Sequence, residues 1–322
     1  MASSPAFAAS VVIPTFNRRE HLRRAIISAM NQTVPVEIIV MDDGSTDDTA
    51  DMVSRRFPQV RFQQFKGPNG PSRLRNCGSQ MASAPILFPI DDDAEFVSPQ
   101  TVEQTLADFD DPRIGAVGIP FINVNRSPAI LQRPPDNGST YVVEQFVGAA
   151  HAIRRDLFLG VGGYRESLFY MGEEGDLCIR LLNRGYVVRL GRAEPMHHHE
   201  SPSRSSFRAD WYARRNDIWF AFHNVPTRHL PLHLAATTAT NLWYGIKVGR
   251  ALRMTRGVVS GWLTAPAALG RRNAVSPRAY RLARQLRAQG PLQLDNIIPL
   301  LPALNPFLIP AEPAPSPAAQ PR

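Results

Sequence analysis

The sequence is poor in the features that stabilise small secreted proteins or cross membranes. Only two cysteines, Cys77 and Cys178, occur among 322 residues, so a disulfide scaffold is excluded and the chain suits a reducing cytosol. No run of 18 apolar residues is present, and we therefore expect no membrane-spanning helix. The first nine residues lack a basic segment and a long apolar core, which makes them a poor signal peptide.

Several well-known catalytic motifs are also missing. The sequence has no G-x-G-x-x-G after its first apolar run, no G-x-x-x-x-G-K-[ST] and no G-x-S-x-G. These absences argue against a Rossmann dinucleotide site, a P-loop and a nucleophile elbow. With 43% apolar residues, however, the chain can bury a sizeable core, so disorder throughout is excluded.

Charge is distributed unevenly along the chain. Residues 1–200 hold 20 basic and 24 acidic residues, whereas residues 201–322 hold 16 basic and 4 acidic ones. Residues 231–256 have helical periodicity, with an apolar stripe that leads into cations at every third position. This pattern predicts contact with an anionic membrane surface, or a stripe that packs on the catalytic domain or on a partner subunit while the cations face solvent. Threonines lower the apolar content of this helix, which favours packing over attachment to a membrane.

Short apolar runs alternate with helical periods in the first half of the chain. The runs predict strands over Ser10–Thr15, Glu37–Asp42, Val60–Gln64 and Ile86–Ile90, each followed by a helix. This order is typical of an α/β fold with a mostly parallel sheet between helices. We expect a catalytic domain over 1–225, a basic helical extension over 226–290, and a disordered Pro-rich tail over 291–322.

Three adjacent carboxylates, Asp91-Asp92-Asp93, follow the predicted strand Ile86–Ile90 directly. They repel one another unless a cation neutralises them, and ligands gather at the carboxyl ends of strands in open α/β sheets. Oxygen ligands suit Mg²⁺ or Mn²⁺ carried on the phosphates of a substrate. The alternative is an acidic turn that is simply solvated.

Other polar clusters occupy similar places. Asp42-Asp43-Gly44-Ser45 ends another predicted strand, and Glu173-Glu174 opens a predicted helix. Helix capping and the helix dipole are sufficient to explain both clusters. Three consecutive histidines, His197 to His199, follow a strand, and one of them can supply a metal ligand while the others face solvent.

Taken in order, five segments resemble the family 2 inverting glycosyltransferases. They are VVIPTFNR (11–18), VMDDGSTD (40–47), RNCG (75–78), IDDD (90–93) and GEEGDLCIRL (172–181). The resemblance covers about residues 10–222 and implies a GT-A-type fold, which is a nucleotide-sugar-binding α/β sandwich with a mostly parallel sheet. The C-terminal helical extension lies outside it.

The resemblance implies a donor site at the ends of the first strands. Pro14, Thr15 and Phe16 are expected to form the floor beneath the nucleotide base, with Phe16 stacked on it. Asp43 is expected to bond the base or the ribose. Arg75 is a weaker candidate for a phosphate or ribose contact, because arginines on helix surfaces commonly just meet solvent.

The resemblance also implies a metal and a general base. Asp91 and Asp93 are expected to bind Mg²⁺ or Mn²⁺, with His198 as a further ligand and Asp92 reaching the nucleotide sugar. Glu174 occupies the catalytic-base position, where many relatives carry Asp in a Glu-Asp pair. Glu174 therefore keeps the carboxylate of that position, although its side chain is longer than the aspartate of those relatives.

The activity implied is metal-dependent, inverting transfer of one hexose or deoxyhexose from a nucleotide sugar to a hydroxyl. The acceptor would be a saccharide or a lipid-linked glycan of cell-envelope, polysaccharide or glycolipid biosynthesis, reached in the cytoplasm or at the inner face of the cytoplasmic membrane. No Q-x-x-R-W is present, so a single addition is favoured over processive synthesis. One alternative is a GT-A protein that binds donor without transfer, and another is a nucleic-acid binder that uses the basic C-terminal third. A nucleotide-sugar pyrophosphorylase is disfavoured, because Asn17-Arg-Arg-Glu stands after the first strand where that class has a Gly-rich phosphate loop.

Overall fold

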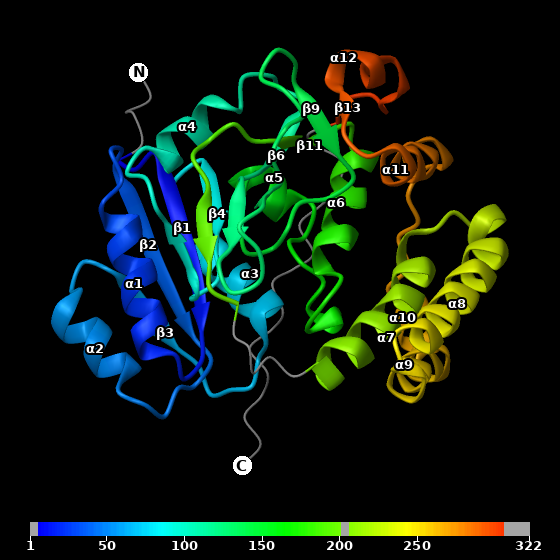
Figure 1. Ribbon diagram of the computed structural model, residues 1–322, viewed down its shortest axis with the longest axis horizontal. Helices are drawn as coiled ribbons and strands as arrows, with labels where there is room; N and C mark the ends of the chain where they lie inside the picture. Colours follow the sequence, from blue (N-terminus) through cyan, green and yellow to red (C-terminus); the bar gives the residue numbers. More distant parts are fainter. Residues whose placement is uncertain (1–5, 201–205, 306–322) are drawn as a thin grey trace.

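The expected alternation of strands and helices is present. The computed structural model describes residues 6–200 and 206–305 (Figure 1). The first elements along the chain are β1 (Ala9–Thr15), α1 (Arg19–Met30), β2 (Val36–Asp42), α2 (Thr49–Arg56), β3 (Arg61–Gln64), α3 (Pro71–Met81), β4 (Ile86–Pro89), β5 (Ala94–Phe96) and α4 (Thr101–Ala107). Those that follow are β6 (Ile114–Gly118), β7 (Phe121–Asn123), β8 (Ile130–Leu131), β9 (Tyr141–Val143), β10 (His151–Arg154), α5 (Arg155–Gly160), α6 (Glu173–Asn183), β11 (Val187–Leu190) and β12 (Met196–His198).

The strands form two sheets. The larger has nine strands in the order β13-β9-β11-β6-β10-β4-β1-β2-β3, and its β4-β1-β2-β3 part is parallel, as predicted. Beyond β4 the sheet is mixed, because β10 runs antiparallel to both β4 and β6. A smaller sheet has the order β5-β12-β7-β8. The α/β class with helices against a large central sheet is confirmed.

Strand β1 is buried along its whole length, and its side chains pack into two separate hydrophobic cores, one on each face of the sheet. Val11 and Ile13 pack with Leu22 of α1, whereas Val12 packs with Leu74 of α3. Successive side chains of a strand point to opposite faces, so a continuously apolar strand needs helices on both sides. The parallel half of the sheet is thereby fixed between α1 and α3, with its carboxyl ends free for a site.

Helix α3 approaches the sheet most closely at Gly78. A Cβ added at this position would lie 2.4 Å from Cγ1 of Val12 and 3.1 Å from Cγ of Met41. We expect Gly78→Ala to lower the free energy of unfolding by about 1–3 kcal/mol, because overpacking a filled core outweighs the helix propensity gained. Urea denaturation measures the change, and an unchanged or more stable variant would contradict this packing.

The C-terminal elements are mainly helical. They are α7 (Ser206–Asn224), α8 (Leu230–Lys247), α9 (Ala251–Leu263), α10 (Ala265–Leu269), α11 (Pro277–Gln289), β13 (Leu292–Gln293) and α12 (Leu294–Ile297), with short 3₁₀ turns at Thr227–His229 and Ile298–Leu300. A further 3₁₀ turn, Glu166–Leu168, lies between α5 and α6. Helices α7 and α9 pack together, and α8 covers both. No helix among the described residues is long and apolar enough to span a membrane.

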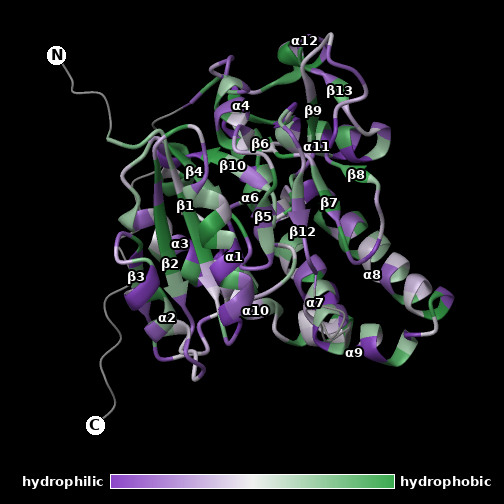
Figure 2. Cartoon of the chain, turned by 60° about the vertical axis from the view of Figure 1, so that its left-hand side comes forward, coloured by the Kyte–Doolittle hydropathy of each residue, from purple (hydrophilic) through white to green (hydrophobic). Residues whose placement is uncertain are grey.

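The single helix predicted over 231–256 is wrong, because the structure divides it. Gly249 has φ +69°, its N–H donates to Ile246 O and the Arg250 N–H donates to Gly245 O. This pair of bonds is the Schellman arrangement, in which a left-handed glycine ends a helix. Helices α8 and α9 therefore form a hairpin at the side of the molecule remote from β1 and β2 (Figures 1 and 2).

The predicted disorder of residues 291–322 is wrong for the part that the structure describes. Strand β13 pairs with β9, and Leu294 and Ile297 of α12 are buried in the core beside β6 and α11. Apolar residues between the prolines supply this packing, which the composition alone hides. Residues 306–322 lie outside the described part.

Candidate active site

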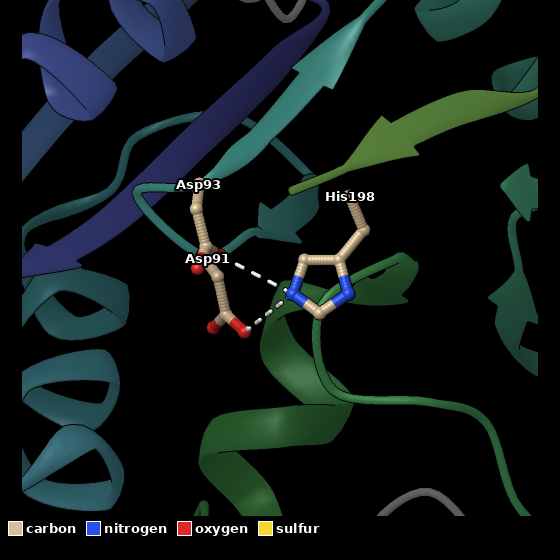
Figure 3. A group of neighbouring side chains, drawn as sticks. All are labelled: Asp91, Asp93 and His198. Carbon is tan, nitrogen blue, oxygen red and sulfur yellow. Dashed lines mark ion pairs between the residues drawn. The ribbon is translucent and has the colours of Figure 1, made fainter. Parts of the chain in front are cut away.

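Three side chains predicted to bind metal converge at the carboxyl edge of the sheet (Figure 3). Donor atoms of Asp91, Asp93 and His198 all lie within 4.8 Å of one another. Nε2 of His198 is 3.2 Å from Oδ1 of Asp93 and 3.8 Å from Oδ2 of Asp91. Two carboxylate oxygens and one imidazole nitrogen are a donor set that suits Mn²⁺ and, less well, Mg²⁺.

Two arginines orient the carboxylates of this triad. Arg18 donates from Nη1 to Oδ2 of Asp93 at 2.6 Å, and Arg75 donates to Oδ1 of Asp91. The other oxygen of each carboxylate is the one that faces His198. The oxygens aimed at the imidazole are therefore those left for a cation, which fits a metal site better than a solvated acidic turn.

Strand pairing explains why His198, and neither neighbour, joins the aspartates. Strand β12 runs antiparallel to β5 with His198 opposite Ala94, the residue after Asp93. Alternate side chains of a strand point to opposite faces. His199 accordingly lies 3.3 Å from Glu95, and its ring lies beside that of His197.

Burial and charge shift the pKa values in this cluster in opposite directions. Burial alone would raise the pKa of Asp93, but the hydrogen bond and charge of His198, together with Arg18, lower it. Burial would lower the pKa of His198, but Asp93 and Asp91 raise it. Burial raises the pKa of Asp92 to about 7 against the pull of Arg18. The imidazole of His198 and the guanidinium of Arg18 thus favour the ionised form of Asp93, the form that binds a cation.

A cavity of about 740 Å³ opens beside the triad. This volume lies within the range of small-molecule sites. Its wall contains the triad and most of the residues predicted to bind donor: Pro14, Thr15, Phe16, Asp43 and Asp92. Phe16 is 54% exposed, so one face of its ring is free to take a planar base.

Two of these wall residues are held by hydrogen bonds within the protein. The carboxylate of Asp43 accepts from the N–H groups of Asn69 and Gly70 at 2.7 and 3.1 Å, which fixes the loop that forms part of the wall. Asp92 accepts from the Thr15 hydroxyl at 2.8 Å and from Arg18 at 3.0 Å. Both carboxylates therefore shape the cavity whatever else they contact.

The opposite wall was missed by the sequence analysis. Phe169, Tyr170 and Arg208 line the cavity, with the Arg208 guanidinium 5.3 Å from the Phe169 ring centroid. Phe169 has φ +61° and sits in a three-residue turn closed by the Tyr170 N–H on Leu168 O at 2.7 Å. Non-glycine residues adopt this conformation rarely, and such strain clusters at functional sites. Only the nearness of Phe169 to the acidic segment 172–181 hints at this wall in the sequence.

Glu174 and Arg75 differ from the rest because they are not among the described residues that line the cavity. Arg75 is only 3% exposed, so it is not the surface arginine that was expected; it contacts Asp91, and its Nη1 lies 3.7 Å from Glu173. Burial raises the pKa of both Glu173 and Glu174. Arg75 therefore joins the metal triad to the two glutamates at the start of α6.

A chain of buried contacts fixes the loop next to Glu174. The Tyr164 hydroxyl lies 2.8 Å from Nε2 of His151, and Nδ1 of His151 lies 3.0 Å from the carbonyl oxygen of Gly148. A Cβ at Gly148 would lie 2.5 Å from Oε1 of Glu174. Burial holds the pKa of His151 well below its usual range, so the neutral ring donates to Gly148 and accepts from Tyr164.

Comparison with known proteins identifies this part of the chain. Residues 10–158 match the family model described as Glycosyl transferase family 2. This region belongs to that family. The match runs from β1 into α5 and includes Asp91 and Asp93, and it ends before α6 and β12, which carry Glu174 and His198.

Two curated relatives share part of the family 2 region. The chain is 39% identical over 90 residues to the poly(ribitol-phosphate) beta-N-acetylglucosaminyltransferase TarP of Staphylococcus aureus (strain N315), covering 26% of this chain and 28% of TarP. It is 40% identical over 94 residues to the GalNAc(5)-diNAcBac-PP-undecaprenol beta-1,3-glucosyltransferase of Campylobacter jejuni subsp. jejuni serotype O:2 (strain ATCC 700819 / NCTC 11168), covering 28% and 30%. The chain thus spans less than a third of the length of each relative.

Solved structures resemble the chain over a longer stretch. S. aureus TarS 1-349 in complex with UDP-GlcNAc has a TM-score of 0.58 at 16% identity, covering 91% of this chain and 90% of that one. The mannosyltransferase PcManGT of Pyrobaculum calidifontis, in complex with GDP-Man and Mn²⁺, has a TM-score of 0.56 at 17% identity, covering 89% and 82%. This likeness confirms the GT-A-type fold predicted for the chain.

Proposed function

We propose that the protein transfers a single sugar from a nucleotide-sugar donor to a hydroxyl of an acceptor, with inversion at the anomeric carbon. The convergence of Asp91, Asp93 and His198 at a cavity also lined by Phe16 carries this proposal. The diphosphate, through a divalent cation, and the planar base are the two parts of a nucleotide sugar that such walls recognise. The solved relatives with UDP-GlcNAc or with GDP-Man and Mn²⁺ support it.

The residues divide the work of transfer as follows. Pro14, Thr15 and Phe16 form the floor for the base, with Asp43 at the base or ribose and Asp92 toward the sugar. Asp91, Asp93 and His198 hold Mg²⁺ or Mn²⁺, which supplies positive charge to the diphosphate when bound. Arg75 is a contact of the protein's own carboxylates in the structure, so its phosphate or ribose role is the weakest of these assignments.

Glu174 is the general base in this scheme. Its burial raises the pKa, which makes the carboxylate a stronger proton acceptor than an exposed glutamate. It takes the proton of the acceptor hydroxyl, whose oxygen then attacks the anomeric carbon from the side opposite the leaving group. Attack from that side inverts the anomeric configuration.

Release of nucleoside diphosphate across a panel of UDP-, GDP- and dTDP-sugars tests the proposal. We expect release with one class of donor that depends on Mn²⁺ or Mg²⁺ and rises when a saccharide acceptor is added. Release that no acceptor stimulates would identify a donor-binding protein without transfer. Binding of DNA or RNA at physiological salt, with no donor used, would favour the nucleic-acid alternative.

The acceptor is a saccharide or a lipid-linked glycan of cell-envelope, polysaccharide or glycolipid synthesis. The beta-1,3-glucosyltransferase relative is named for an undecaprenol-linked substrate, which supports the lipid-linked class. Such an acceptor would bring this chain, from the cytoplasm, to the inner face of the cytoplasmic membrane as a peripheral protein. We assign transfer to residues 1–225 and keep 226–290 as a separate extension.

A further inference from the structure

Among the C-terminal helices, α8 to α11 carry basic side chains and no acidic ones. Residues 218–294 contain eleven Lys and Arg residues and no Asp or Glu. A stretch of this length without any acidic side chain creates a positive field that attracts anionic partners. The α8–α9 hairpin lies within it and projects away from the sheet (Figure 2).

The apolar stripe predicted on α8 faces outward in the structure. Leu232, Trp243 and Ile246 are 78%, 60% and 70% exposed. The residues that α8 buries are others, including Leu234 and Gly245. The expectation that the stripe packs on the catalytic domain of this chain is therefore wrong, and these three side chains remain largely uncovered by the described residues. Packing on a partner subunit, the other form of that expectation, stays a prediction.

Exposed apolar and cationic side chains gather where α8 turns into α9, a segment over residues 243–256 that we call the hairpin tip. The two helix ends lie close together, since a Cβ at Gly245 would be 3.2 Å from Cα of Ala251. Leu252 is 67% exposed, as Ile246 is to 70%, and Lys247 Nζ lies 5.1 Å from the centroid of the Trp243 ring. Tryptophan, aliphatic and basic side chains in this mixture are typical of a protein surface that enters the headgroup region of a bilayer.

We propose that the hairpin tip binds the surface of an anionic phospholipid bilayer, with its apolar side chains inserted and its cations on the lipid phosphates. The positive charge of the hairpin tip favours anionic lipid over a second copy of this chain as the partner of this surface. A second copy of the chain packed tip to tip would bring one cationic surface against another, relieved in the described part of the chain only by Asp210, whose Oδ1 lies 3.4 Å from Nη1 of Arg250, whereas anionic lipid neutralises the cations. The proposal goes beyond sugar transfer, because vesicle binding is measured without donor or acceptor.

Sedimentation of the full chain with vesicles tests the proposal. We expect binding to phosphatidylcholine vesicles that contain phosphatidylglycerol, and little binding to phosphatidylcholine alone. Binding should weaken in about 1 M NaCl, where the Debye length is about 3 Å. Failure to bind anionic vesicles, or equal binding to neutral ones, would overturn the proposal.

A matched pair of variants locates the cationic contribution. Lys247→Gln with Arg256→Gln should weaken partitioning about thirtyfold, at about 1 kcal/mol for each charge near an anionic surface. Arg55→Gln with Arg56→Gln removes the same charge from α2, at the other side of the molecule (Figure 1), and should leave partitioning within about threefold. Equal effects of the two pairs would show attraction by net charge alone and would overturn the assignment to the tip.

The apolar contribution is tested with Ile246→Ser and Leu252→Ser together. Both side chains are largely exposed, so the fold should be kept, while partitioning should fall at least about tenfold. If the wild-type chain is a dimer that these changes dissociate, a second copy covers the tip and the proposal is wrong. Asp93→Asn should keep vesicle binding, so failure of the membrane site is distinguishable from failure of the transfer site.

Discussion

Replacing Glu174 with Gln is expected to slow sugar transfer by a factor of about 10²–10⁴ while donor affinity stays within a few-fold. Positioned general bases contribute rate factors of this size. Glutamine keeps the shape of the side chain beside Gly148 but accepts no proton. The measurement is kcat for transfer, together with calorimetric binding of the donor that the enzyme uses.

The pH profile gives a second readout of the same residue. A base works when it is deprotonated, so kcat falls as the pH falls through its pKa. Because burial raises the pKa of Glu174 above the usual 4.5, the acidic fall in rate should begin above pH 4.5 in the wild type. Residual activity of Glu174→Gln should lack this limb.

Glu173 offers a control from the same turn of α6. Its Oε1 lies 3.7 Å from Nη1 of Arg75, and its Oε2 has no hydrogen-bond partner among the described residues. Burial raises its pKa, so the protonated form is favoured and glutamine is a close substitute. We expect Glu173→Gln to keep kcat within about tenfold. If Glu173→Gln abolishes transfer while Glu174→Gln is active, the base has been assigned to the wrong glutamate.

Those parts of the site that depend on local sequence could be predicted. Asp91 and Asp93 were recognised because three carboxylates directly follow a buried strand, and strand ends in a parallel sheet share one edge. The start of α6 was recognised because acidic residues there fit both a helix terminus and the family resemblance. In each case the signal lies within a few residues of the side chain that it predicts.

Features that depend on tertiary contacts could not be derived from the local sequence. The family resemblance pointed to His198 among three histidines, but the physical reason for that choice is the register of β12 on β5, which joins segments about a hundred residues apart. Arg18 lies within a recognised motif, yet only the folded chain shows that it orients Asp93. The predicted packing of the α8 stripe on the catalytic domain was wrong for a related reason. Periodicity reveals that a helix has an apolar face, but it does not show what covers that face.

Asp93→Asn should weaken binding of Mn²⁺ together with donor by more than about 100-fold. Replacing a residue that only hydrogen-bonds to a metal ligand typically lowers metal affinity about 10–100-fold, so loss of a charged ligand itself should lower it more. Oδ1 of Asp93 faces His198 while Oδ2 is held by Arg18, so an amide here removes the charge without moving the strand. The measurement is calorimetric titration of donor with and without Mn²⁺, with the melting temperature as a check on folding.

Asp92→Asn is the matched control because it makes the same chemical change one residue away. The carboxylate of Asp92 faces Thr15 and Arg18, and an asparagine can accept from Arg18 and donate to the Thr15 hydroxyl. Since burial raises the pKa of Asp92 to about 7, much of its charge is already lost near neutral pH. We therefore expect Asp92→Asn to weaken Mn²⁺-dependent binding less than about tenfold. Equal losses in the two variants would mean that the cluster acts through its total charge, and that Asp91, Asp93 and His198 are not a specific metal site.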